Sequence, residues 1–354
     1  MRCIFLTLGL QINRLDQWVA NAPMALLPKG TGMPKSRSGS RPSVPRMNPT
    51  HAPRRALDLP GGVLMTGFCL ALGLQQVAIK AVAADVSPLA QIAIRSLAAA
   101  PLMGLLAFWR GARWNDVRAH WRPGLLLGLG FTLEFTFVAW GLHYTLASHM
   151  SVFLYTAPVF AALGLHFGVA GEQLSRHQWW GTALAFAGMV IAMAPPAKGA
   201  DATAILIGDA LGLLAGLSWA ATTVVLRRSS LSEAPPEQSL CYQLATAALL
   251  LMPACLLLGD LAAINPTRLA LASLGFQTLV ISSGALLLWF ALLRRYRASQ
   301  LGVLSFLSPI FGVLFGVVLL HEPLTLNFLV GGVTMLAGIF LVTRPRETSA
   351  NDRR

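Results

Sequence analysis

The sequence predicts an all-α integral membrane protein with ten transmembrane helices, arranged as two inverted five-helix repeats. Three observations lead to this prediction: the composition, a series of long apolar runs, and a set of landmarks that occurs twice. The chain has 354 residues, of which 55% are hydrophobic and 12% are charged, whereas soluble domains average about 25% charged residues. This balance excludes a disordered chain, a disulfide scaffold and an ordinary soluble enzyme.

Residues 1–60 form a leader that differs from the rest of the chain. They contain eight of the 21 prolines and nine Lys or Arg against two Asp, so they carry more than half of the formal net charge of +13. A segment of this composition buries too little apolar surface to offset the entropy lost on ordering. We therefore expect a disordered leader without a signal peptide, with a start of translation at Met47 as the alternative.

From Gly61 onward the chain is a succession of apolar runs of about 18–24 residues, each long enough to cross the ~30 Å hydrocarbon layer as a helix. A helix satisfies its own backbone hydrogen bonds in lipid. The connections are short, which indicates a compact bundle without an extramembrane domain. In chain order, the ten runs cover residues 61–82, 86–108, 123–143, 148–169, 177–194, 205–226, 239–258, 269–292, 298–320 and 325–343.

Arginine and lysine side chains are concentrated in alternate connections between these runs. Under the positive-inside rule, the arginine-rich connections lie in the cytoplasm. Both termini are then cytoplasmic, and residues 344–354 form a basic cytoplasmic tail. The positive charge thus follows from membrane topology and from the leader, so the expected surroundings are a lipid bilayer and no nucleic-acid partner is expected.

Several landmarks recur after an offset of 150–151 residues, so the chain contains an internal repeat. Two five-helix halves follow, covering residues 61–194 and 205–343. Because five is odd, the second half enters the membrane in the opposite orientation, as in secondary transporters that bind substrate near the midplane. The matched landmarks are Ala147-Ser148 with Ala298-Ser299, Pro158 with Pro309, Glu172-Gln173-Leu174 with Glu322-Pro323-Leu324, Gly181 with Gly331, and Gly188 with Gly338.

These landmarks resemble those of the paired EamA-type domains of the drug/metabolite transporter superfamily. The stretch from Gly208-Asp209 to Ser218-Trp219-Ala220 is also similar to the second half of that family. The resemblance covers nearly the whole chain after residue 60. It implies ten helices, a location in the bacterial inner membrane, and efflux or uptake of small metabolites, amino acids or drugs, but it does not identify the solute.

Three charged residues within the apolar runs are candidates for transport or coupling. Glu134 lies eleven residues after Pro123, near the middle of its run, where a carboxylate is costly and usually marks a pathway. We predict proton coupling there; the alternative is a buried carboxyl that clamps neighbouring helices. A helical rise of ~1.5 Å per residue places Arg95 at a similar depth in the membrane. Arg95 either holds a substrate carboxylate or neutralises Glu134. Lys80 lies at the outer end of the first run and either snorkels to the interface or lines the pathway.

A cavity for a metabolite needs a few polar groups on largely apolar walls. Polar and amphipathic side chains within the apolar runs are therefore candidates for lining it, although each also fits a contact between helices. These candidates are Gln75, Gln76, Trp140, His149, Tyr155, Trp219, Tyr242, Gln243, Gln277, Ser282, Trp289 and Ser305.

Pro158 and Pro309 occupy equivalent positions in the middle of their runs. Proline removes a backbone donor and clashes with the preceding turn, so we predict a kink at each, serving as a hinge or as a static bend. Glu172 and Glu322 lie in short connections just before the next helix. We expect each to cap the positive end of that helix.

The sequence contains no phosphate-binding loop and no hydrolase or metalloprotease motif. We therefore predict no ATP-driven motor, no enzyme, no cofactor and no metal site. The first functional hypothesis is an ion-gradient-driven carrier for a small amphipathic solute, with proton-coupled export by alternating access, acting as a monomer or a homodimer. The alternatives are an intramembrane enzyme acting on lipid-linked substrates and a helical scaffold that transports nothing.

Overall fold

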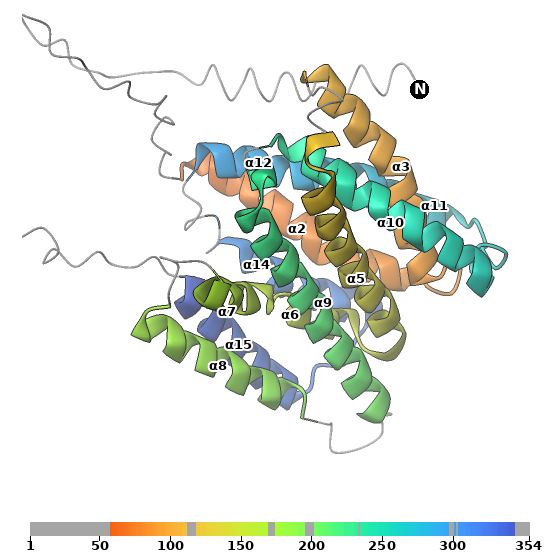
Figure 1. Cartoon of the computed structure of the whole chain (residues 1–354). Coiled ribbons are helices and arrows are strands. Elements are labelled where there is room, and N and C mark those ends of the chain that lie inside the picture. Colours follow the sequence, from red (N-terminus) through yellow and green to blue (C-terminus); the bar gives the residue numbers. More distant parts are fainter. Residues whose placement is uncertain are drawn as a thin grey trace, which may run out of the picture. The chain divides into compact units, whose positions relative to one another are not determined.

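The computed structural model describes residues 57–111, 118–168, 174–194, 202–232, 234–296, 301 and 304–343, which are largely helical (Figure 1). All of them belong to one compact unit, Pro53–Arg354. The first half contains α2 (Leu59–Ala81), α3 (Pro88–Trp109), α5 (Trp121–Tyr144), α6 (Ala147–Leu154), α7 (Ala157–Gly168) and α8 (Arg176–Ala192). The second half contains α9 (Ala202–Arg228), the short η1 (Ser230–Ser232), α10 (Pro236–Leu258), α11 (Arg268–Gly275), the π-helical η2 (Phe276–Ala285), α12 (Leu286–Arg295), α14 (Leu307–Leu320) and α15 (Leu326–Thr343).

Among the described residues, eight helical segments are long and apolar enough to cross a membrane, where α6 with α7 (Ala147–Gly168) and α11 with η2 and the start of α12 (Arg268–Trp289) each count as one segment. Two predicted runs correspond to shorter helices, namely α8 with 17 residues and α14 with 14 residues. The ten-helix count therefore remains a prediction. The predictions for Met47, for most of the leader, for Glu172 and for the 344–354 tail lie outside the described residues.

α2 begins two residues before the first predicted apolar run, which starts at Gly61. The helix starts at Leu59, because the Asp58 side chain caps it by accepting a hydrogen bond of 2.9 Å from the Gly61 backbone N–H. Pro60 stands in the first turn, where a missing N–H costs nothing. The same Asp58 carboxylate accepts a hydrogen bond of 2.6 Å from the Tyr296 hydroxyl at the end of α12, and this bond lowers the pKa of Asp58.

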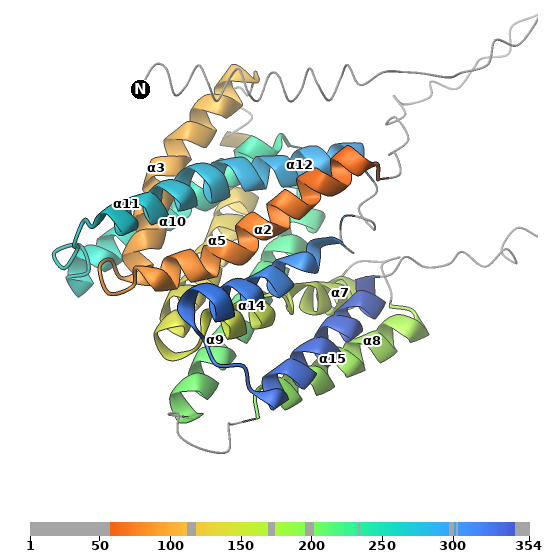
Figure 2. The ribbon, with the colours of Figure 1, turned by 180° about the vertical axis from the view of Figure 1, so that it is seen from behind.

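The principal helix contacts join the two halves of the chain. α3 packs along α10, and α8 packs along α15, so helices with the same position in their halves meet. In addition, α5, α6 and α7 pack on α9, while α14 packs on α2. Figures 1 and 2 show α8 beside α15 and α2 beside α14 from opposite sides. The largest apolar core cluster accordingly combines side chains from both halves.

Glycines allow α8 and α15 to touch backbone to backbone. A Cβ placed on Gly188 would lie 2.7 Å from the carbonyl oxygen of Gly331, and one on Gly331 would lie 2.6 Å from that of Gly188. Gly181 and Gly338 show the same relation, at 2.8 and 2.6 Å. Small residues at such positions let membrane helices approach closely. The glycine landmarks of the repeat thus form a contact surface between the halves.

A turn precedes each of the two prolines, Pro158 and Pro309, at which the sequence predicts a kink. α6 ends at Leu154, Tyr155 and Thr156 form a turn, and Pro158 is the second residue of α7. Pro309 is the third residue of α14, which follows a turn at Phe306. Within the first turn of a helix the backbone N–H has no intrahelical partner, so proline fits there without loss of a hydrogen bond.

Candidate functional site

Arg95 and Glu134 lie on neighbouring helices in the interior of the bundle. Arg95 on α3 is 1% exposed, and Glu134 on α5 is 7% exposed. The guanidinium carbon of Arg95 stands 4.2 Å from the centroid of the Phe135 ring, and the guanidinium interacts electrostatically with the Glu134 carboxylate. The structure therefore brings the two predicted residues together, although no ion pair within 4.0 Å joins them in the described part of the chain.

Arg95 keeps unused hydrogen-bond donors in this buried position. Its Nε and Nη1 atoms have no hydrogen-bond partner among the described residues. Buried polar groups are nearly always hydrogen-bonded, and a buried charge is strongly unfavourable unless it is paired. The contact with Phe135 and the field of Glu134 offset only part of this cost. Unpartnered guanidinium donors suit an anionic acceptor such as a carboxylate, because hydrogen bonds between charged groups are the strong ones.

Gln91, one turn before Arg95 on α3, belongs to a hydrogen-bond network that the sequence analysis did not identify. Its Nε2 donates to the carbonyl oxygens of Ile79 and Val86 at 2.9 and 2.8 Å. Its Oε1 accepts a bond of 2.7 Å from Gln277, whose own Oε1 has no partner within the described ranges. The network ties α2, α3 and η2 together. A polar residue four positions from Arg95 lies on the same helix face, and that spacing was the available signal.

The other predicted cavity residues are distributed over the bundle. Buried ones are Gln75, Gln76, Tyr155 and Ser282; partly buried ones are Trp219, Tyr242, Gln243, Trp289 and Ser305; and Trp140 is 48% exposed. Tyr155 meets Trp219 edge-on with ring centroids 5.5 Å apart, and Trp289 stacks on Phe68 at 5.4 Å. These two pairs are aromatic packing contacts between helices.

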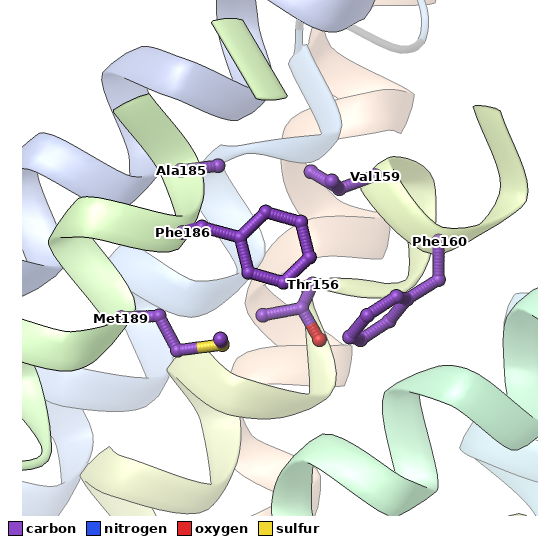
Figure 3. Close-up of a pocket in the computed structure, with 6 residues that line it drawn as sticks. All are labelled: Thr156, Val159, Phe160, Ala185, Phe186 and Met189. Carbon is purple, nitrogen blue, oxygen red and sulfur yellow. The ribbon is translucent and has the colours of Figure 1, made fainter. Parts of the chain in front are cut away.

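A small apolar pocket lies between α8 and the region where α6 gives way to α7 (Figure 3). Phe160 and Phe186 meet edge-to-face there, with centroids 5.9 Å apart. The hydroxyl of Thr156 donates to the carbonyl of Phe153, which leaves the pocket without a donor for a polar solute. The residues that line it are Thr156, Val159, Phe160, Ala185, Phe186 and Met189, and none of them is a predicted cavity residue.

Glu322 caps a helix, but not the helix that the sequence analysis predicted. Its Oε1 and Oε2 atoms accept hydrogen bonds of 2.7 and 2.9 Å from the backbone N–H groups of Ala147 and Ser148, at the start of α6. Glu322 itself lies between α14 and α15, in the other half of the chain. A carboxylate satisfies orphan N–H groups and the positive end of the macrodipole equally well when it comes from a distant segment.

Lys80 also binds the backbone at the start of α6. Its Nζ donates to the carbonyl oxygen of Thr145, two residues before the helix, and it interacts electrostatically with Glu322. The side chain is partly buried. Lys80 therefore turns inward to a backbone acceptor, whereas the snorkelling interpretation expects an ammonium group at the membrane interface.

His149 of α6 forms a buried pair with Asp209 of α9. Its Nδ1 lies 3.0 Å from both carboxylate oxygens of Asp209, which also accepts the hydroxyl of Thr145. Phe328 of α15 stacks on the His149 ring with centroids 4.0 Å apart, and Asp209 is 1% exposed. The sequence analysis did not select Asp209 as a candidate residue. The criterion that selected Glu134, a carboxylate within an apolar run, applies to it equally.

Known proteins resemble this chain over most of its length. The model of the EamA-like transporter family matches residues 59–194 and 206–344. A protein of Salmonella typhimurium described as a probable amino-acid metabolite efflux pump is 30% identical over 61% of this chain and 75% of its own length. An uncharacterised transporter of Archaeoglobus fulgidus is 27% identical over 70% of this chain and 85% of its own. A solved crystal structure, 21% identical, shares the fold with a TM-score of 0.59 over 82% of this chain and 99% of that one.

Proposed function

Because this chain belongs to the EamA-like transporter family and is a multi-pass membrane protein, we propose that it exports small amphipathic solutes in exchange for protons. The proposed carrier works by alternating access in the bacterial inner membrane, with both termini in the cytoplasm. Amino acids and their analogues are the first solutes to test, because a relative from Salmonella typhimurium carries the description of a probable amino-acid metabolite efflux pump.

The observation that carries the proposal is the buried pair of Arg95 and Glu134. Arg95 offers two unpartnered donors next to a carboxylate that is 7% exposed. An anionic group of the solute can use these donors, while Glu134 takes up the proton that moves in the opposite direction. Charged residues at this depth are expensive and characteristically belong to pathways or proton relays.

The packing between the halves supports alternating access. Two five-helix halves of opposite orientation can exchange conformations, because each half can adopt the shape of the other. Equivalent helices meet at α3 with α10 and at α8 with α15, as expected for a two-fold axis between such halves. In this proposal the buried polar residues Gln75, Gln76 and Ser282 face the solute in at least one conformation of the cycle.

The neutral variant Glu134→Gln tests the proposal in proteoliposomes. We expect at least a tenfold loss of solute flux driven by a pH gradient, because glutamine keeps the size of the side chain and cannot carry the proton. Leu133→Ala is the matched control, since Leu133 is the adjacent residue of α5 and is 50% exposed. Unchanged gradient-driven flux in Glu134→Gln would show that Glu134 has no part in coupling.

A further inference from the structure

The start of α6 brings together a histidine and three charged side chains from other helices and connections. Two carboxylates approach it from the second half of the chain: Glu322 binds its first N–H groups, and Asp209 binds His149. Lys80 binds the preceding carbonyl from α2. We call these four residues, together with Thr145, the α6 cluster. It joins α6 of the first half to α9 and to the α14–α15 connection of the second half.

The charges of the α6 cluster balance only when a proton is bound. Lys80 has Glu322 as its electrostatic partner, so Asp209 depends on His149 for a counter-charge. With a neutral imidazole, the cluster contains two carboxylates and one ammonium group. A carboxylate that is 1% exposed and uncompensated is strongly unfavourable. With an imidazolium, two positive and two negative charges remain, and the cluster is neutral.

The His149 ring lies between the Asp209 carboxylate and the face of the Phe328 ring. Nδ1 faces both oxygens of Asp209 at 3.0 Å, so this nitrogen carries the hydrogen. Phe328 stacks on the ring at an interplanar angle of 4°, and an aromatic face attracts a cation. The second nitrogen, Nε2, is then the basic atom of the ring that can accept a proton. Two further histidines lie close in sequence to members of the cluster, His143 before Thr145 and His321 before Glu322, and both are exposed.

We propose that the His149–Asp209 pair is a proton-binding site that clamps α6 to the second half of the molecule. A proton from the adjoining aqueous phase binds Nε2 of His149, and the resulting ion pair holds α6 against α9. When the proton leaves, the Asp209 carboxylate requires water, and the contact between α6 and α9 weakens. The inference deepens the proposed proton-coupled transport and rests on it for its role in the cycle, although the site itself can be measured without any solute.

Hydrogen–deuterium exchange of purified, solute-free protein in lipid nanodiscs tests the site. After normalisation for the intrinsic pH dependence of exchange, we expect the amides of residues 147–154 to be protected about fivefold better at pH 5.5 than at pH 8. In His149→Asn the pH effect falls below about twofold, because asparagine retains a donor near the Nδ1 position and cannot take up a proton. His177→Asn, an exposed histidine of α8, keeps the wild-type pH effect.

Asp209→Asn provides a second, independent variant. It also abolishes the pH effect, and the double variant with His149→Asn behaves like either single one, because both remove the same interaction. Equal protection of α6 in the wild type at both pH values would overturn the inference even if neither variant folds. If solute flux depends on pH but the protection of the α6 amides does not, this site is refuted and the proposed function stands. If protection depends on pH but no proton-coupled flux is found, the proposed function is refuted and the proton-binding site stands.

Discussion

At the scale of single residues, the buried ionisable groups distinguish this chain from a purely structural bundle. Arg95 is 1% exposed and lacks partners for two of its nitrogen atoms within the described residues. A structural role alone would be better served by an apolar side chain, since replacing buried charges by well-packed apolar groups is often neutral or stabilising. Arg95 contacts the Phe135 ring and interacts electrostatically with Glu134. This position fits an anion-binding side chain.

Substitutions of Arg95 separate recognition from packing. We expect Arg95→Gln to raise the apparent KM for solute efflux about tenfold, which corresponds to roughly 1.4 kcal/mol of lost binding. Arg95→Lys should lie between this variant and the wild type, because an ammonium group keeps the charge but cannot bind a carboxylate through two parallel hydrogen bonds. Leu97→Ala, at a residue of α3 that is 52% exposed, serves as the control. An unaltered KM in Arg95→Gln would remove Arg95 from solute recognition.

At the scale of helices, the contact between α8 and α15 depends on glycine at specific positions. Gly331 and Gly332 are adjacent, but only Gly331 faces α8. A Cβ on Gly331 would stand 2.3 Å from the backbone nitrogen of Ala192, whereas a Cβ on Gly332 meets nothing within 4 Å. The two positions therefore provide a matched comparison within a single helix.

Gly331→Ala should destabilise the protein by about 1–3 kcal/mol, because the added methyl group forces the two backbones apart. Gly332→Ala should change the free energy of unfolding by less than about 1 kcal/mol and in the stabilising direction, since alanine favours a helix over glycine. The measurement is reversible unfolding of both variants in mixed micelles. Equal stability of the two variants would contradict the close backbone contact.

The sequence predicts the positions of the helices better than it predicts the contacts between distant segments. The apolar runs locate α2, α3, α5, α9 and α10 within a few residues at most boundaries, because length and hydropathy are local properties. The turns at Tyr155 and Phe306 lie three residues before the two prolines at which kinks are predicted. Their exact positions could not be predicted, because a proline at the start of a helix and a proline within one look alike in a single sequence. Glu322 was assigned to the wrong helix because its hydrogen bond to Ala147 spans 175 residues, and no local pattern encodes such a contact.

At the scale of the whole bundle, hydrogen bonds fasten the two halves at both ends. At one end Asp58 of the first half accepts from Tyr296 of the second. At the other end Asp85, in the connection between α2 and α3, accepts from the Asn265 amide at 3.2 Å and the Thr267 hydroxyl at 2.7 Å, in the connection between α10 and α11. In the proposed cycle, one set of contacts opens while the other remains closed, which is what alternating access requires.

The most direct test of the central claim follows solute and proton together. Wild-type proteoliposomes are preloaded with radiolabelled amino acids and a pH-sensitive dye, and solute efflux and internal pH are recorded in the same vesicles. The account predicts that efflux acidifies the lumen in a fixed ratio of protons to solute, and that an inward proton gradient drives efflux against a solute gradient. Efflux without any change of internal pH, or no efflux across a full panel of amino acids and analogues, would contradict it.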